Sequence, residues 1–472
     1  MGLLPFRHQS LRLFGLARKV LIVDEVHAYD HYMQTLLNQL LAHHARQGGS
    51  AILLTATLPY SMREELVAAW RQGLELAPAT LEEDAFPLLT QVGRATQREV
   101  PLATRPEVTR TVGIDWLTAE KQALEIVMAA VEAGECVAWV RNTVDDAIRA
   151  YEQLRQSHPD PERCLLFHSR FAMVDRQRIE SDVLERLGKA STPDRRRGQV
   201  LVSTQVFQES LDCDVDLLIS DLAPIDLLIQ RAGRLQRHVR GPRRAPVLSV
   251  LAPEWSEAPD AQWLKRALPG TQAVYRDTSL LWLTQRVLRE LGAIRMPEEA
   301  RALIEGVYGS VAELVPDGLQ EARWEQRGMQ GVAVSMAHFN ALSLEQGYLR
   351  QPEIDQWQEE REIGTRLVDE PTVNVVLLKR DADDELALWA EGERYAAMLS
   401  QVKLRQSQAE KLADLPAGDQ ARWEALQERH KALRFTRPWL VEDDPVCAYD
   451  ALWGVRFSMT TENQGEGCEP AQ

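Results

Sequence analysis

Short apolar runs alternate with amphipathic stretches between residue 20 and about residue 253, and this alternation limits the folds open to the chain. Apolar runs of four or five residues are typical of strands buried in a parallel sheet, and the longer stretches are typical of crossover helices. The predicted strands are Val20–Val23, Ala51–Leu54, Cys136–Val140, Cys164–Phe167, Gln199–Val202, Leu217–Ser220 and Val247–Leu251. The predicted helices are Tyr32–Arg46, Ser61–Gln72, Ala119–Ala133, Val144–Gln156 and Met173–Leu187. We therefore predict an α/β fold.

Two breaks in composition interrupt this pattern. Residues 77–110 are rich in Pro, Thr and Glu and read as the passage between two lobes, and a second break falls at residues 253–259. Residues 263–308 have a helical pattern, whereas the remainder mixes a strand-like run at 373–378 with polar helices at 409–412 and 423–433. These changes predict four segments: residues 1–85, 86–255, 256–310 and 311–472.

The balance of charges excludes a generally polycationic protein. The formal net charge is −16 and the pI is about 5.2, so any contact with nucleic acid must come from a local basic surface. Five cysteines form no CxxC pair and are predicted to be free thiols in a reducing compartment. No apolar run approaches the roughly 20 residues of a membrane span, and the first residues lack the layout of a signal peptide. We expect a cytoplasmic protein without a membrane partner.

Two adjacent acids follow the first predicted strand. Asp24 and Glu25 lie at its carboxyl end, where open parallel sheets bind ligands. Mg²⁺ needs few protein carboxylates when phosphate oxygens are beside it, so Asp24 is the predicted metal ligand. Glu25 is placed to orient or deprotonate an attacking water, and His27 to relay between this site and the next motif. An ordinary acidic turn after a strand is the alternative.

Two hydroxyl residues, Thr55 and Thr57, follow the next predicted strand. They can hydrogen-bond to the acidic motif and to a second lobe, which would couple hydrolysis to movement. A cap for the following helix is the alternative.

A third strand end carries Ser203 and Thr204, followed by Asp212. A strand that runs into a helix start offers N–H and hydroxyl donors for a nucleic-acid phosphate, and Asp212 is placed to touch a nucleotide sugar. A simple strand-to-helix cap is again the alternative.

The strongest single signal is an arginine-rich stretch that begins at Gln230. Arg234 and Arg237 are three residues apart, which predicts one helical face, and Gly233 allows close backbone approach. A guanidinium is a planar donor fork that matches phosphate oxygens and stays charged. These residues are the predicted contacts to a γ-phosphate, although a solvated basic helix face is the alternative.

Taken with their neighbours, these motifs resemble one family, the CRISPR-associated helicase–nuclease of type I interference systems. The resemblance is carried by residues 21–30 (LIVDEVHAYD), 53–59 (LLTATLP), 167–171 (FHSRF), 203–206 (STQV), 209–212 (ESLD) and 221–234 (DLAPIDLLIQRAGR). It implies two RecA-like lobes, ATP and Mg²⁺ as cofactors, and single-stranded DNA pulled through a channel under a C-terminal domain. It also implies recruitment by an RNA-guided, multi-subunit surveillance complex, and DNA contacts by Asn142, Thr143, Ser203 and Thr204.

On this resemblance the four segments become an incomplete first RecA-like lobe, a complete second RecA-like lobe with a parallel sheet and flanking helices, a helical linker and a mixed α/β C-terminal domain. The printed sequence has no His-Asp dipeptide of the family's nuclease and no G-x-x-x-x-G-K-[S/T] phosphate loop. We therefore expect a helicase portion that is inactive alone and is completed by a separate chain carrying the nuclease domain and the phosphate loop. The alternative is a non-catalytic remnant or accessory module that binds DNA or the surveillance complex.

Overall fold

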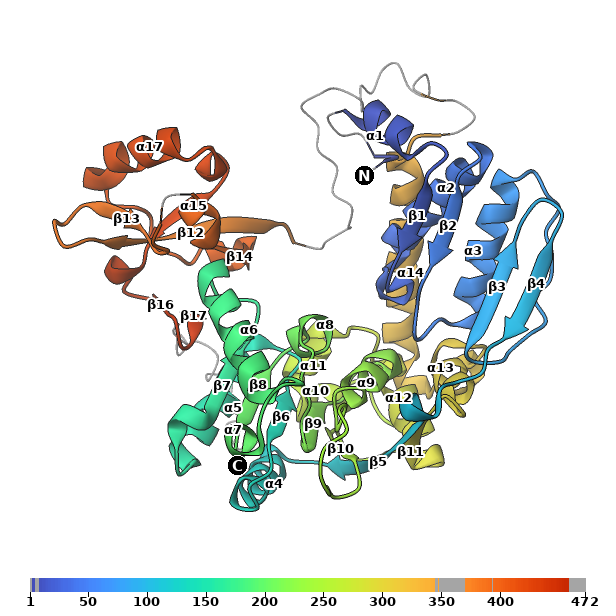
Figure 1. Ribbon diagram of the computed structural model, residues 1–472, viewed down its shortest axis with the longest axis horizontal. Helices are drawn as coiled ribbons and strands as arrows, with labels where there is room; N and C mark the ends of the chain where they lie inside the picture. Colours follow the sequence, from blue (N-terminus) through green and yellow to red (C-terminus); the bar gives the residue numbers. More distant parts are fainter. Residues whose placement is uncertain (1, 5–7, 344–346, 348–369, 393, 458–472) are drawn as a thin grey trace, which may run out of the picture. The chain divides into compact units, whose positions relative to one another are not determined.

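The computed structural model describes residues 2–4, 8–343, 347, 370–392 and 394–457, which form two compact units. Neither unit is a continuous piece of chain. The first unit takes its described residues from the ranges 1–120, 220–233 and 244–368, and the second from 121–219, 234–243 and 369–472. Figure 1 shows the elements with their labels.

The first unit mixes helices with short strands. Its helices are α1 (Gln9–Leu16), α2 (His31–Arg46), α3 (Tyr60–Gly73), α9 (Ile225–Ala232), α10 (Trp263–Ala267), α11 (Pro269–Val274), α12 (Thr278–Leu291), α13 (Ala300–Tyr308) and α14 (Asp317–Asn340). Its strands are β1 (Val20–Val23), β2 (Ser50–Leu53), β3 (Leu88–Val92), β4 (Gln97–Pro101), β5 (Arg110–Leu117), β10 (Val247–Leu251) and β11 (Ala293–Met296).

Strands β1 and β2 pair in parallel, and the helices α2 and α3 supply the core on one of their faces (Figure 1). Val23 of β1 packs in a cluster with Leu37 and Leu41 of α2 and Leu66 of α3. The opposite face is open, because Ile22 is 63% exposed although parallel strands are usually covered on both faces. This small sheet holds the acidic motif and Thr55 at its carboxyl ends.

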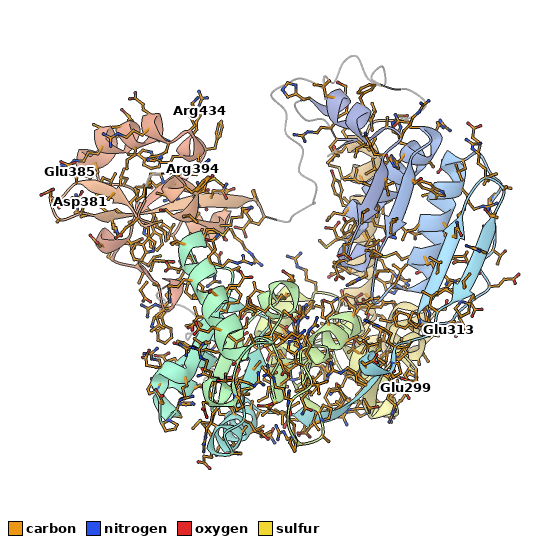
Figure 2. All side chains as sticks on the ribbon, in the orientation of Figure 1. Glu299, Glu313, Asp381, Glu385, Arg394 and Arg434 are labelled. Carbon is orange, nitrogen blue, oxygen red and sulfur yellow. The ribbon has the colours of Figure 1, made fainter. Side chains whose placement is uncertain are left out.

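The prediction that residues 263–308 are helical is wrong at one place. Gly292, with φ of +70°, ends α12, and the next four residues form β11, which pairs antiparallel with β5. A left-handed glycine stops a helix, and Ala293–Met296 then continues as a strand. Arg295 pairs with Glu299, which is labelled in Figure 2 (2.8 Å).

The second unit holds the predicted strands at residues 136–140, 164–167 and 199–202. Its helices are α4 (Glu120–Glu132), α5 (Val144–Ser157), α6 (Met173–Leu187), α7 (Pro193–Arg196), α8 (Val206–Ser210), α15 (Ala396–Leu399), α16 (Gln406–Ala409) and α17 (Gln420–Arg429). Its strands are β6 (Val137–Val140), β7 (Cys164–Phe167), β8 (Val200–Ser203), β12 (Thr372–Arg380), β13 (Leu386–Leu388), β14 (Gln401–Arg405), β15 (Arg437–Leu440), β16 (Cys447–Asp450) and β17 (Gly454–Phe457).

Strand β9 (Leu217–Asp221) lies where the two units meet in sequence. Among the described residues, the sheet with the most strands has the order β11-β5-β10-β9-β6-β8-β7. The pairs β5–β10, β6–β8 and β7–β8 are parallel. The prediction of an α/β fold with a parallel sheet is confirmed.

The C-terminal segment builds a smaller sheet around β12, which pairs with β13, β14 and β15. The turn after β12 is closed by Asp381, whose carboxylate accepts from the backbone N–H of Glu385 (2.9 Å); both residues are labelled in Figure 2. The predicted helix at 409–412 is displaced, because α16 ends at Ala409. The parts of this segment at 344–346, 348–369, 393 and 458–472 lie outside the described residues.

The four cysteines in the described ranges are free, as the spacing predicts, and the structure shows that they are buried; Cys468 lies outside these ranges. Within the described ranges, no helix combines the length and apolar character needed to cross a membrane.

Candidate active site

The acidic motif lies directly after β1, at the end of the strand. One Asp24 carboxylate oxygen accepts from the backbone N–H of Glu25 (2.9 Å), and both side chains are exposed. Glu25 has φ of +52°, in the left-handed region that non-glycine residues rarely adopt. Such backbone conformations cost about 1–3 kcal/mol and gather at functional sites. The strand end therefore presents two solvent-facing carboxylates on a constrained bend.

Asp24 fits a magnesium ion of the kind that binds beside phosphate. Mg²⁺ keeps several waters and takes one or two carboxylates, so an exposed aspartate on a fixed bend is a suitable ligand. Across the described ranges, no group of three or more His, Cys, Asp or Glu side chains is arranged to hold a metal by itself. Asp24 as the ligand of the ion stays a prediction.

His27 joins three of the predicted site residues. Its side chain is 3% exposed, its Nδ1 lies 2.9 Å from Thr55 Oγ1, and its Nε2 lies 2.6 Å from Gln230 Nε2. Glu25 approaches the same Nε2 at 3.4 Å. A hydrogen-bonded chain thus links the strand ends of β1 and β2 to helix α9.

Thr57 contributes an unusual buried hydroxyl. Its residue is 1% exposed, and its Oγ1 has no hydrogen-bond partner within the part of the chain that the structure describes. A buried polar group without a partner is uncommon in folded proteins and calls for an explanation such as a functional role.

The predicted helical face for Arg234 and Arg237 is wrong. Helix α9 ends at Ala232, Gly233 caps it, and the two arginines lie in the following turn. Leu235 bridges to Val215 instead, and Gln236 adopts a left-handed conformation, so a helix cannot continue.

Both arginines contact groups of the second unit. Arg234 donates to the Gln208 carbonyl (2.8 Å), and Arg237 pairs with Asp212 (2.7 Å between Nε and Oδ1). The structure therefore brings together the predicted site residues Arg237 and Asp212. Their approach to the acidic motif, which belongs to the first unit, stays a prediction.

The predicted DNA-contacting side chains serve the fold of the second unit. Ser203 is fully buried and its hydroxyl donates to the Phe167 carbonyl (2.8 Å). Thr143 caps α5 by accepting from the Asp146 N–H (3.0 Å). Asn142 and Thr204 are buried as well. Contact of these residues with DNA stays a prediction.

Two buried residues escaped the sequence reasoning. Arg231 is fully buried and donates to the Ser220 hydroxyl (2.7 Å) and the Asp221 carbonyl (3.2 Å). Its apolar neighbours in α9 were the available signal that it faces inward. His168 is fully buried as well, and burial together with the nearby Arg170 charge lowers its pKa to about 3.

Comparisons with known proteins identify the family. The family model described as "CRISPR-associated nuclease/helicase Cas3, C-terminal" matches residues 133–240. The CRISPR-associated endonuclease/helicase Cas3 of Escherichia coli (strain K12) is 34% identical over 343 residues, which cover 70% of this chain and 36% of that protein.

Solved structures agree. The crystal structure of T. fusca Cas3 with AMPPNP has a TM-score of 0.80 and 28% identity, and the match covers 97% of this chain and 56% of that chain. A chain in a CRISPR RNA-guided surveillance complex, pre-nicking, has a TM-score of 0.75 and 26% identity, and the match covers 97% of this chain and 59% of that one. The chain thus spans 36% of the length of the curated relative and little more than half of each solved chain. It belongs to the Cas3 family of CRISPR-associated nuclease/helicases and corresponds to the C-terminal half of such a protein.

Proposed function

We propose that this chain is the ATP-dependent, single-stranded-DNA helicase portion of a type I CRISPR effector that acts in antiviral defence in the cytoplasm. The observation that carries the proposal is the hydrogen-bonded chain from Thr55 through His27 to Gln230. It joins the acidic motif, the threonine motif and the arginine-rich motif, which are far apart in sequence. A solvated acidic turn would need no such buried connection.

The proposed roles follow from the chemistry of each side chain. When bound, ATP would supply the phosphoanhydride bond that is hydrolysed, and Mg²⁺ would supply positive charge beside the phosphates. Asp24 would hold the metal, and Glu25 would orient or deprotonate the attacking water. His27 and Gln230 relay between this site and the neighbouring motifs. Thr55 and Thr57 couple ATP hydrolysis to movement. Arg234 and Arg237 stabilise the charge that develops on the transferred phosphoryl group, while Asp212 meets the nucleotide sugar.

We also propose the partners and segments that the family suggests. One similar chain was solved in an RNA-guided surveillance complex, and another with an ATP analogue, which supports these partners for this chain. The segments 1–85, 86–255, 256–310 and 311–472 would be the incomplete first lobe, the second lobe, the linker and the C-terminal domain. Asn142, Thr143, Ser203 and Thr204 would line the DNA path, with backbone groups as the donors where the side chains are engaged.

A second candidate function is a DNA-binding or complex-binding module without turnover. It is favoured by the engagement of both candidate arginines, Arg234 with a backbone carbonyl and Arg237 with Asp212. In that case the acidic motif would be a remnant, and DNA binding would be indifferent to ATP.

One experiment separates the two candidates. The chain is mixed with, or joined to, a segment carrying a phosphate-binding loop, and ATP hydrolysis is measured with and without single-stranded DNA. The helicase proposal expects DNA-stimulated hydrolysis that Asp24→Asn and Arg234→Ala each lower at least about 100-fold, because arginine fingers contribute about 10³–10⁵ in rate. The exposed Glu64→Gln on α3 is the matched control and should leave the rate unchanged. DNA binding without any hydrolysis would favour the accessory module.

A further inference from the structure

Two segments of the second unit run beside each other, the bend at residues 211–216 and the loop at residues 234–243. The Gln236 N–H donates to the Val215 carbonyl (2.8 Å), and the Val215 N–H donates to the Arg234 carbonyl (3.3 Å). We call the second segment the arginine loop, because it contains Arg234, Arg237, Arg240 and Arg243. It begins with the two arginines that are proposed to meet the γ-phosphate.

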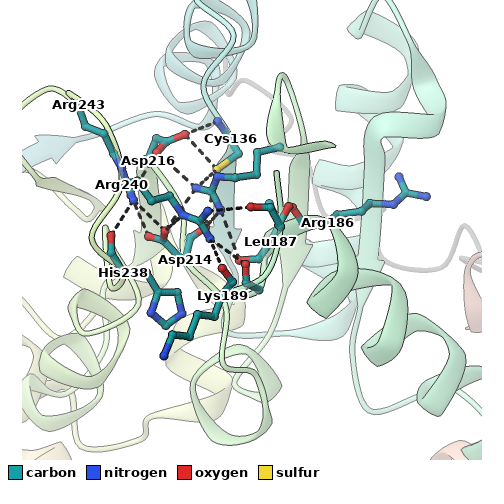
Figure 3. A network of polar contacts seen from close by, with 12 residues as sticks. Cys136, Arg186, Leu187, Lys189, Asp214, Asp216, His238, Arg240 and Arg243 are labelled. Carbon is teal, nitrogen blue, oxygen red and sulfur yellow. Dashed lines mark hydrogen bonds and ion pairs between the residues drawn. The ribbon is translucent and has the colours of Figure 1, made fainter. Parts of the chain in front are cut away.

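Asp214, on the bend, is the centre of a charged network that ties down the far end of the arginine loop (Figure 3). Its side chain is fully buried. Arg240 Nε lies 2.6 Å from its Oδ2, and Arg243 makes two contacts of 2.9 Å, one to each carboxylate oxygen. Burial alone would raise the pKa of Asp214, but hydrogen bonds from Arg243 and Arg240 and the charge of Arg196 hold it below its ordinary value. The carboxylate is therefore charged and offsets one of the positive charges of the loop.

The same two loop arginines also reach backbone groups outside the loop or across it. Arg240 donates to the carbonyls of Ser191 (2.9 Å) and Gly188 (2.8 Å), and Arg243 donates to the His238 carbonyl (2.9 Å). These bonds hold the loop in one shape as long as the guanidinium groups stay in place. A partly buried guanidinium is stabilised by a counter-charge, and Asp214 is the acid that both of them share.

The near end of the loop is held by the same bend. Asp212 lies two residues before Asp214 and pairs with Arg237 (2.7 Å). The bend thus holds the arginine loop at two places, through an exposed pair at Arg237 and through the buried Asp214 at Arg240 and Arg243. The exposed pair can exchange for a phosphate, whereas opening the contacts of Asp214 with Arg240 and Arg243 would leave its buried carboxylate without them.

We propose that Asp214 is a positioning residue, which fixes the arginine loop so that Arg234 and Arg237 are aimed at the transferred phosphoryl group. The inference rests on the proposed function and names a residue that acts through others. Misplacement of a reacting or stabilising group by about 1 Å can cost about 100-fold in rate. Loss of the shared counter-charge would therefore lower turnover more than nucleotide binding.

The test compares Asp214→Asn with the native chain, each mixed with or joined to the segment that carries the phosphate-binding loop. We call this combination the assembly. The expected result is a fall of about 10- to 100-fold in kcat, with the KM for ATP within about twofold. The Gln236 amide, followed by hydrogen exchange in the chain alone, should exchange at least tenfold faster. The matched control is Asp419→Asn, which also removes a buried carboxylate shared by two arginines, Arg380 (2.8 Å) and Arg422 (2.9 Å). It should lower the melting temperature and leave kcat unchanged.

A second variant separates positioning from general stability. The double variant Asp214→Asn/Arg240→Gln removes one of the positive charges that Asp214→Asn leaves without a partner. Its melting temperature should recover toward the native value, whereas its kcat should stay low. Recovery of kcat together with melting temperature would overturn the inference, as would normal kcat in Asp214→Asn. If the native assembly shows no hydrolysis, the proposed function fails, and the exchange measurement decides alone: an unchanged Gln236 rate then overturns the inference and a faster rate supports it.

Discussion

His168 should make the stability of the chain depend on pH in a way that one substitution removes. Its Nδ1 accepts from the Arg170 N–H (3.1 Å), and its Nε2 lies 3.1 Å from the Trp453 carbonyl, to which it donates. A ring nitrogen that accepts from a backbone N–H carries no proton, so the folded state holds a neutral imidazole. This geometry agrees with the lowered pKa of about 3, against an ordinary value of 6.5.

The size of the effect follows from linkage. Between pH 6.5 and pH 3 the unfolded chain binds a proton at His168 that the folded chain does not, so stability falls as pH falls. The slope is about 1.4 kcal/mol per pH unit, and the loss between pH 7.5 and pH 5 is about 2 kcal/mol. His168→Asn replaces the ring with a group that does not titrate, and this loss should disappear from the variant.

Urea unfolding at pH 7.5, 6 and 5 measures the difference between the two proteins. The variant will be less stable at every pH because hydrogen bonds are lost, so the slope rather than the absolute value is diagnostic. Other histidines are present in both proteins and cancel in the comparison. Replacement of the exposed His31 by Gln is the control and should keep the native slope. Equal slopes for the native chain and His168→Asn would refute the reasoning.

Three further outcomes are expected. Gln230→Ala breaks the contact with His27 Nε2 and should lower DNA-stimulated kcat about tenfold with little change in melting temperature, as measured by ATPase assay and calorimetry. Ile22→Thr changes an exposed apolar residue on the open face of β1 and should reduce self-association in light scattering without loss of stability. Tyr449→Phe removes a hydroxyl that donates to buried Asp175 (2.6 Å) and should cost about 1–3 kcal/mol in urea unfolding.

Each of these outcomes has a clear opposite. A Gln230→Ala variant with native kcat would show that the His27 chain does not serve turnover. Light scattering that is equal for native and Ile22→Thr chains would place self-association elsewhere. For Tyr449, the exposed Tyr395→Phe is the control and should be neutral. An equally neutral Tyr449→Phe would mean that water replaces the lost bond.

The sequence was most informative where a local pattern decides the structure. The predicted bounds of β1, β7, β10 and α6 agree with the structure to the residue, because buried apolar runs and strong helical repeats need no distant partner to be recognised. Strand β5 was missed, because it begins at the last residue of the Pro-, Thr- and Glu-rich break. Its partners β10 and β11 come more than a hundred residues later.

The candidate active site shows the same difference between features that a local pattern predicts and features that depend on distant residues. Local motifs named His27, Thr55 and Gln230, but the bond between His27 and Gln230 joins residues 203 positions apart and could not be read from either motif. Spacing placed Arg234 and Arg237 on a helix, whereas Gly233 and the left-handed Gln236 put them in a turn. The network around Asp214 gave no signal at all, since an aspartate near arginines in sequence is usually solvated.

The interleaving of the two units has a practical consequence for anyone who divides the protein. The chain leaves the first unit after residue 120, returns at 220, leaves again after 233 and returns at 244. A proteolytic nick or a truncation placed between residues 121 and 243 therefore yields two pieces, each holding fragments of both cores. Such pieces could regain the native structure only by folding together, so complementation from separately purified halves should fail where co-expression succeeds.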